Sequence, residues 1–89
     1  MALNAKMERI NMKNCYRTKD LAESAFLYAS QKKLMHTIRD NGKLWFIFEG
    51  KVLCEKLSDS FWRKEATVNA KEFADALRTL KDIVFSKEY

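Results

Sequence analysis

The chain has 89 residues, of which 47% are hydrophobic and 33% are charged, and its formal net charge is +5 at pH 7. This composition excludes an intrinsically disordered chain, and the length predicts a single domain, residues 1–89, near the lower size limit for one core. The longest apolar run, Leu44 to Phe48, is far too short to cross a bilayer and the N-terminus lacks a signal-peptide apolar block, so we expect a cytoplasmic protein with no membrane partner.

The N-terminal part predicts a frayed start followed by a strand. Residues 1–7 show no clear period. From Glu8 the residues alternate with period two, which is typical of a half-buried strand. One side of this strand is largely apolar and includes Tyr16. The other side carries a row of three basic residues: Arg9, Lys13 and Arg17.

The next segment predicts a helix from about Lys19 to Ser30. Thr18 is suited to cap its N-terminus, and Asp20 in the first turn favours the helix dipole. Five apolar residues recur at helical spacing along one side: Leu21, Ala22, Ala25, Phe26 and Ala29. The acidic residues of this helix, Glu23 among them, are expected to face solvent.

The centre of the chain carries the strongest local signal, the Asn41-Gly42 pair between two apolar runs. A type I′ turn needs positive φ at both central residues, and Asn and Gly adopt it at the lowest cost. The two-residue loop predicts the register of a hairpin: Asp40 faces Lys43, Ile38 faces Trp45, His36 faces Ile47 and Leu34 faces Glu49. Both sides of the second strand are apolar, so we expect it to be central and covered on both faces.

A second helix is predicted from about Val52 to Arg63. Its apolar residues recur every four positions: Leu53, Leu57 and Phe61, with Cys54 and Trp62 beside them. Residues 65–68 predict either a short edge strand or a linker.

The last helix has the clearest start. Asn69 followed three residues later by Glu72 makes a capping box of the Asn type, and an apolar stripe runs from Phe73 to about Phe85. The order of elements is therefore β-α-β-β-α-(β)-α. It predicts an α+β domain, a small and mainly antiparallel sheet with a central Asn-Gly hairpin and helices packed on it.

Few residues offer chemistry. Cys15 and Cys54 lie outside any disulfide or metal spacing and predict free thiols, although the basic neighbours of Cys15 leave open a lowered thiol pKa. The one histidine, His36, shares a face with Trp45 and Ile47, which favours a core imidazole over a metal ligand. Because the sequence shows neither a phosphate loop nor a nucleophile paired with a base, we expect no catalytic residues, no metal, no cofactor and no enzymatic activity.

A basic surface that binds nucleic acid is the remaining candidate. Seven basic residues lie close together in chain order: Arg9, Lys13, Arg17, Lys19, Lys32, Lys33 and Arg39. Such residues can follow a phosphate backbone, with Tyr16, Tyr28 or Trp62 as candidates to stack on bases. A charge of +5 is also, and more often, that of an ordinary soluble protein.

The alternative function is protein binding. An open sheet edge, or an apolar patch around Trp62, is suited to a homodimer or to a modulator of a host protein.

Several short motifs are spread along the chain: Thr18-Lys19-Asp20-Leu21, Ala25-Phe26-Leu27, Phe46-x-Phe48 and Leu77-Arg78-x-Leu80-Lys81. With them the chain resembles, over residues 16–85, a family of short uncharacterised proteins of bacteria, phages or mobile elements that is grouped as a domain of unknown function. The motifs are mostly core and capping positions, and Gln31-Lys32 replaces the family's usual glycine. The resemblance implies a phage or bacterial setting and carries no catalytic or ligand residues.

Overall fold

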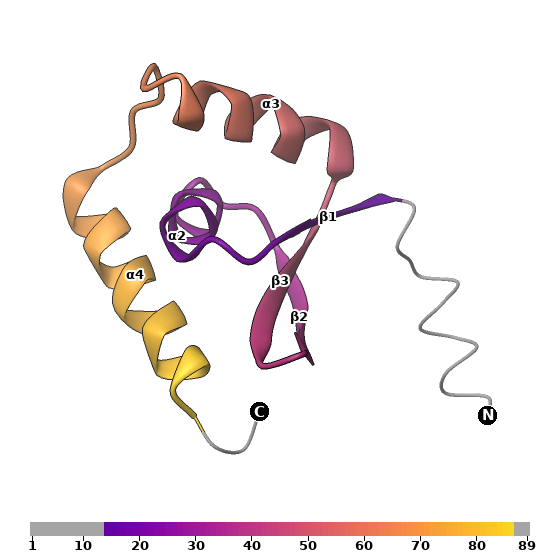
Figure 1. The fold of residues 1–89 in the computed structure, drawn as a ribbon. Coiled ribbons are helices and arrows are strands. Elements are labelled where there is room, and N and C mark those ends of the chain that lie inside the picture. Colours follow the sequence, from indigo (N-terminus) through magenta and orange to yellow (C-terminus); the bar gives the residue numbers. More distant parts are fainter. Residues whose placement is uncertain (1–13, 87–89) are drawn as a thin grey trace.

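A computed structural model of the protein describes residues 14–86. Within them the elements are β1 (Cys15–Thr18), α2 (Leu21–Ala29), β2 (Leu34–Asp40), β3 (Lys43–Glu49), α3 (Lys51–Trp62) and α4 (Ala70–Val84). The predicted α+β fold is confirmed as a three-stranded antiparallel sheet with helices packed on it (Figure 1). In this part of the chain every helix falls short of the length and apolarity that a membrane crossing needs.

The Asn-Gly hairpin organises the sheet, as the sequence predicts. Asn41 and Gly42 have φ angles of 54° and 79°, the pair of positive values that a type I′ turn requires. The strand order is β1-β3-β2, and both pairings are antiparallel. The prediction of a central strand after the turn is confirmed, because β3 has a neighbour on each side.

The predicted hairpin register is correct near the turn and wrong at the far end. Every pair from the turn back to His36 is the expected one. Leu34, however, pairs with Phe48 rather than with Glu49, because β2 is irregular between Leu34 and His36. An extra residue at this point is typical of a β-bulge, which shifts the register of all residues beyond it.

β1 is the described end of the predicted first strand; the rest of that strand and the predicted frayed start lie outside the described residues. Tyr16 packs against the core and the Thr18 hydroxyl bonds to a residue of α2, so both point toward the helices. Arg17 lies between them and points to the opposite face of the sheet. The predicted alternation is therefore confirmed for this segment.

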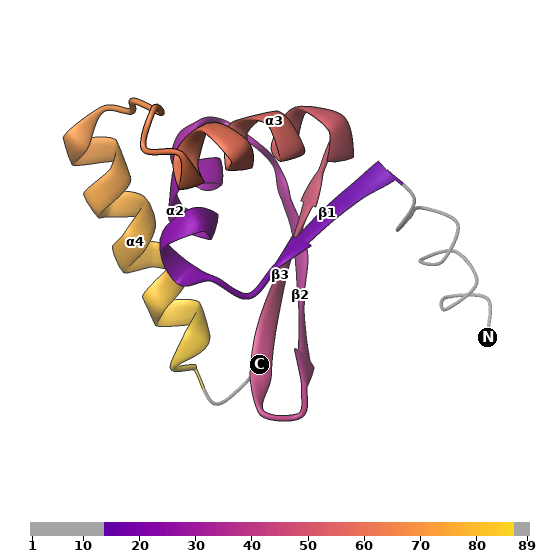
Figure 2. The same cartoon turned by 45° about the horizontal axis from the view of Figure 1, so that its top comes forward.

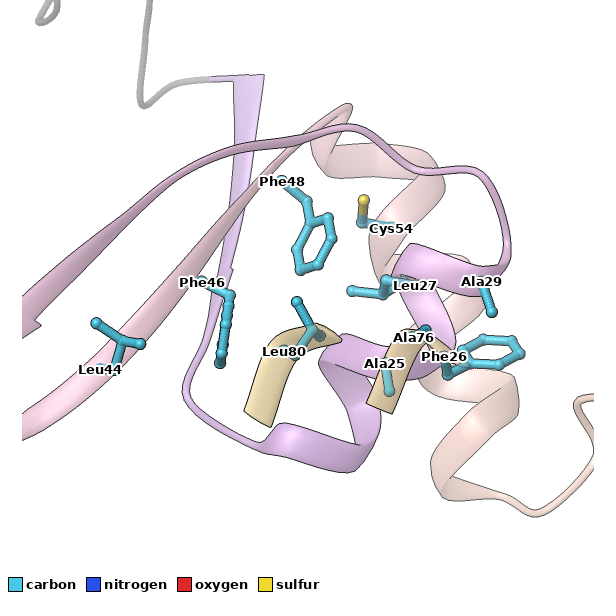
Figure 3. Packing of buried hydrophobic residues seen from close by; sticks show 10 residues of the cluster. All are labelled: Ala25, Phe26, Leu27, Ala29, Leu44, Phe46, Phe48, Cys54, Ala76 and Leu80. Atoms are coloured by element: carbon cyan, nitrogen blue, oxygen red, sulfur yellow. The ribbon is translucent and has the colours of Figure 1, made fainter. Parts of the chain in front are cut away.

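One face of the sheet and the helices together form the core, seen from close by in Figure 3. Its buried apolar residues come from four elements: Ala25, Phe26, Leu27, Ala29, Leu44, Phe46, Phe48, Cys54, Ala76 and Leu80. The members from β3 are every second residue, so this strand gives one face to the core. The residues between them, Trp45 and Ile47, belong to the other face.

α2 is buried on more sides than the sequence predicts. Figure 1 shows this helix end-on, with α3, α4 and the strands around it. Leu27 and Glu23 are therefore buried as well as the expected stripe, whereas Ala22 is exposed. The N-cap is Asp20, whose Oδ1 accepts the backbone N–H of Glu23 at 2.8 Å, so the prediction of Thr18 as the cap is wrong.

α3 lies in the predicted segment but is turned about its axis relative to the prediction. Its buried residues are Cys54 and Ser58, and Leu57 and Phe61 are half-buried. Leu53, which we expected in the apolar stripe, is 55% exposed. The polar Ser58 is buried because a carboxylate from α2 is its partner in the core.

α4 is the best-predicted helix. The Oδ1 atom of Asn69 accepts the backbone N–H of Glu72 at 2.9 Å, which confirms the N-cap. Ala76 and Leu80 are buried at the centre of the predicted stripe, and only its end fails, since Phe85 is 77% exposed. Residues 65–68 form a linker, with no strand.

The second face of the sheet has no helix on it within residues 14–86. Figure 2 shows the three helices together on one side of the strands. Ile47 is nonetheless fully buried, while Trp45 is half-buried and Ile38 is 41% exposed. The prediction that both faces of β3 are covered is therefore confirmed for Ile47 and wrong for Trp45, which is only partly buried because all described helices pack on the face of Phe46 and Phe48.

Candidate functional site

The side of the sheet on which no described helix packs, which we call the open face, is the most distinctive surface in the described part of the chain. Strand alternation and the pairing of the three strands define its members: Cys15, Arg17, His36, Ile38, Asp40, Lys43, Trp45, Ile47 and Glu49. Ile47 and Cys15 are buried, so a ligand can reach the indole, the imidazole, the exposed Ile38 side chain, two cations and two carboxylates. The accessible part of this face therefore offers apolar contact together with charged groups, of which Arg17 lies next to Trp45.

Two cations lie on the ring of Trp45. The guanidinium carbon of Arg17 is 4.6 Å from the ring centroid, and the Nζ atom of Lys19 is 5.2 Å from it. Both distances are within the range of cation–π attraction, which is worth ~0.5–1 kcal/mol per pair at exposed sites. Trp45 therefore holds two positive charges together at the β1 side of the open face.

Two of the seven basic residues predicted to bind nucleic acid lie at this ring. Arg17 and Lys19 come together there because residues 17 and 19 lie on the same side of an extended chain. Two more predicted residues, Arg9 and Lys13, lie outside the described residues. Trp45 itself is the member that the sequence analysis missed, since we assigned it to the covered core.

The other three predicted cations lie elsewhere. Arg39 pairs with Leu44 and so points to the helix side of the sheet, where its Nη2 atom donates to the Val84 carbonyl oxygen at 3.4 Å. Lys32 and Lys33 connect α2 to β2, at the end of β2 that is far from the Asn-Gly turn. The five predicted cations within residues 14–86 thus do not form one continuous surface.

The aromatic residues proposed for base stacking have different environments. Trp62 is 57% exposed at the C-terminal end of α3, where its ring makes an edge-to-face contact with Phe61 at 5.2 Å. Tyr28 is 38% exposed on α2. Tyr16 points into the protein and is not a candidate for stacking. Trp62 remains a candidate protein contact, on the helical layer and apart from the open face.

A buried carboxylate with three hydroxyl partners lies on the helix side of β1, and the sequence analysis missed it. Glu23 is only 3% exposed, so the expectation that it faces solvent is wrong. The Tyr16 hydroxyl donates to its Oε2 atom at 2.5 Å, Ser58 donates to the same oxygen, and Thr18 donates to Oε1 at 2.7 Å. The Tyr16 hydroxyl is also 2.9 Å from Ser58 Oγ. This network joins β1, α2 and α3, and it fixes the direction in which β1 presents Arg17.

The network should make stability sensitive to alkaline pH. Burial, followed by the hydrogen bond to Glu23, raises the pKa of Tyr16 to about 12, compared with about 10 for a tyrosine in an unfolded chain. The phenol proton therefore stabilises the folded state fully below about pH 10, and this contribution is lost as the pH rises through 12. We expect the thermal midpoint to fall over this range, with a smaller fall in Tyr16→Phe. Equal alkaline losses in the two proteins would contradict the role of Tyr16.

The two cysteines are buried, and His36 lies on the other side of the sheet from Cys54. Burial raises the thiol pKa of both Cys15 and Cys54, and the carboxylate of Glu49 raises that of Cys15 further, so the alternative of an activated Cys15 is wrong. His36 is half-buried on the open face, whereas Cys54 belongs to the core on the other side of the sheet. Residues 14–86 also contain no group of three potential metal ligands.

Comparisons of the chain with protein-family models, with curated proteins and with solved structures found no match. Any functional proposal therefore rests on the residues of this protein alone. Among them, the two cations on Trp45 form the feature whose chemistry is most specific.

Proposed function

We propose that this protein is not an enzyme and that it binds single-stranded nucleic acid on the open face. The supporting observation is the ring of Trp45 with Arg17 and Lys19 beside it on a sheet surface that no described helix covers. Surfaces that bind single strands combine an aromatic platform for the bases with positive charge for the phosphates. The open face supplies both within one small area.

The guanidinium of Arg17 on the Trp45 ring is suited to bind phosphate. A planar guanidinium that lies on an aromatic ring keeps its N–H groups at its edge, where they can donate to phosphate oxygens. Arg17 and Lys19 are both exposed, so both charges are accessible to a nucleotide. Ile38, at 41% exposure, extends the apolar surface across β2. A nucleotide on Trp45 would thus meet a stacking surface and two phosphate partners.

A single strand fits this surface better than a duplex. Sequence readers of duplex DNA insert a helix or a two-stranded ribbon into the major groove. Here the cations lie on the face of the sheet, and the described helices are all on its other side (Figure 2). Unstacked bases can reach a flat aromatic platform, whereas paired bases in a duplex cannot.

Binding is tested with Trp45 as the only tryptophan. The chain has two, so Trp62→Phe leaves Trp45 as the reporter, and its fluorescence should fall when oligodeoxythymidine or oligouridine is added. Loss of one stacked base costs about 1–3 kcal/mol, so Trp45→Ala should weaken binding of a labelled oligomer by about tenfold or more. Arg17→Ala should also lower the slope of log affinity against log salt by about 0.7.

Lys56→Ala is the matched control for this experiment. It removes the same charge from an exposed position on α3, away from the open face, and should leave the slope almost unchanged. Absence of binding to single-stranded DNA and RNA at low salt would refute the proposed function. An Arg17→Ala variant that behaves like Lys56→Ala would show that only overall charge matters.

A protein-interaction module is the alternative function. It is favoured by four large apolar side chains that are more than half exposed: Val52, Leu53, Trp62 and Phe85. Homodimer formation in light scattering, or a captured host protein, would favour this alternative over nucleic-acid binding. A cytoplasmic location belongs to either proposal, because Cys15 and Cys54 are free thiols and such thiols are usual in reducing compartments.

A further inference from the structure

A cavity of about 490 Å³ opens where β1 ends, on the helix side of the sheet. Its apolar walls come from α2, β3 and α4: Leu21, Leu44, Phe46 and Val84. Its polar lining consists of Lys19, Asp20 and Lys43. The volume lies within the range of about 300–1,000 Å³ that is typical of small-ligand sites, so there is room for a base and part of its sugar.

The short length of β1 explains why this cavity exists. β1 pairs with β3 only from Phe46 to Glu49, because the chain leaves the sheet after Thr18 to begin α2. The first residues of β3 therefore have a partner strand on one side only. Leu44 pairs with Arg39 at the position next to the turn pair, where an antiparallel hairpin makes no hydrogen bonds. Its backbone N–H and C=O thus point to the side that β1 has left.

Two cations line the cavity and a third lies beside one of its walls. Lys19 and Lys43 line it directly. Arg39 lies beside Leu44 on the neighbouring strand and donates to the carbonyl oxygen of Val84, another wall residue. The one acid of the lining is Asp20, whose Oδ1 atom already accepts a backbone N–H as the N-cap of α2. An anionic ligand with a flat apolar body is therefore complementary to the cavity in charge and in lining.

Lys19 belongs both to this cavity and to the Trp45 site, where its Nζ atom is 5.2 Å from the ring centroid. From this shared residue we infer that the single strand bound on the open face passes the edge of β3 that β1 leaves free and places one base in the cavity. The phosphates next to that base contact Lys19 and Lys43, and the polar groups of Asp20 and Leu44 lie at the edge of the base. This inference rests on the proposed function and names a second subsite within it.

Methyl NMR spectra of the full-length protein give the direct test. Addition of an oligodeoxythymidine of roughly six nucleotides, a length within the known site sizes, should shift the methyl signals of Leu21, Leu44 and Val84. The methyl signals of Leu53, which is exposed on α3, should stay in place. An oligomer of the same length without bases keeps the phosphates, and it should not shift the three cavity signals.

Two variants test the cavity while keeping Trp45, Arg17 and Lys19. Val84→Trp is the decisive one, because strand alternation places Lys43 on the same side of β3 as Trp45. Val84→Trp fills the cavity and should weaken binding of the thymidine oligomer by about tenfold. For the fluorescence measurement, Val84→Phe is used in a Trp62→Phe background, so that Trp45 stays the only tryptophan. Quenching of Trp45 by the oligomer should persist in that protein. Lys43→Gln removes a rim charge at an exposed position and should weaken binding about threefold at low salt. Lys51→Gln, an exposed position at the start of α3, is its control and should bind as the wild type does.

The outcomes separate this inference from the proposed function. If Val84→Trp and Lys43→Gln bind as the wild type does while Trp45→Ala and Arg17→Ala bind weakly, the cavity holds no base and the proposed function stands. Cavity signals that respond to an acidic peptide and not to the oligomer would also overturn the inference. If the wild type binds no single strand, both the proposed function and the inference fail.

Discussion

Phe48→Ala is expected to lower the free energy of unfolding by about 3–5 kcal/mol, the largest effect of any single truncation considered for this protein. Phe48 is fully buried on the central strand and packs within the cluster that joins the sheet to the helices (Figure 3). A domain of this size has a total stability near the lower end of ~5–15 kcal/mol. The variant should therefore be partly unfolded at room temperature.

The matched control is Phe85→Ala, which removes the same side chain from a position that is 77% exposed. Its effect should remain within about 0.5 kcal/mol, because exposed side chains outside the core contribute little to stability. Urea unfolding followed by circular dichroism measures both variants. Similar urea midpoints for the two would show that Phe48 is not part of a packed core.

The prediction of Phe48 as a core residue came from the sequence, and it shows which features are local enough to be predicted. The Asn41-Gly42 turn and the alternation of β3 depend on neighbouring residues only, so the turn, the register next to it and the central strand are predicted correctly. Which face of β3 the helices cover depends on contacts between distant elements. The sequence therefore predicted both faces as covered, and Trp45 was assigned to the core although it is half-buried on the open face.

For the basic residues, too, the placement that depends on neighbouring residues could be predicted and the placement across strands was missed. Arg17 and Lys19 are two positions apart on an extended segment, so their common side follows from alternation. Arg39 was grouped with them by chain order alone. The predicted register already paired it with Leu44, and this pairing was the available signal that Arg39 lies on the other face from Arg17.

Burial of Glu23 could not be predicted from its position in the first turn of a helix, where acids are usually solvated. It is buried because α2 is surrounded by α3, α4 and the sheet (Figure 1). The apolar stripe of this helix was also assigned incorrectly in part: Ala22 was included and is exposed, whereas Leu27 was left out and is buried. Contacts of this kind appear only once all the neighbouring elements are in place.

Glu23→Ala should consequently cost about 2–4 kcal/mol, because it leaves three hydroxyl groups of the interior without their common acceptor. Glu23→Gln keeps one acceptor oxygen and should cost less, about 1 kcal/mol, as should Ser58→Ala. Because Tyr16 and Thr18 hold β1 through this carboxylate, Glu23→Ala should also loosen Arg17 from the ring of Trp45. The fluorescence of Trp45 in a Trp62→Phe background reports that change.

Glu72→Ala is an unusually close control for Glu23→Ala. Both glutamates lie three residues after an N-cap, Asp20 or Asn69, and both donate their backbone N–H to the cap side chain. They differ in burial, since Glu23 is 3% exposed and Glu72 is on the surface. Loss of an exposed first-turn acid costs only about 0.3–1 kcal/mol through the helix dipole. If urea unfolding shows the same loss of unfolding free energy in both variants, the three hydroxyl bonds to Glu23 contribute nothing to stability. We expect a larger loss for Glu23→Ala, and the difference measures the contribution of the buried network that orients β1.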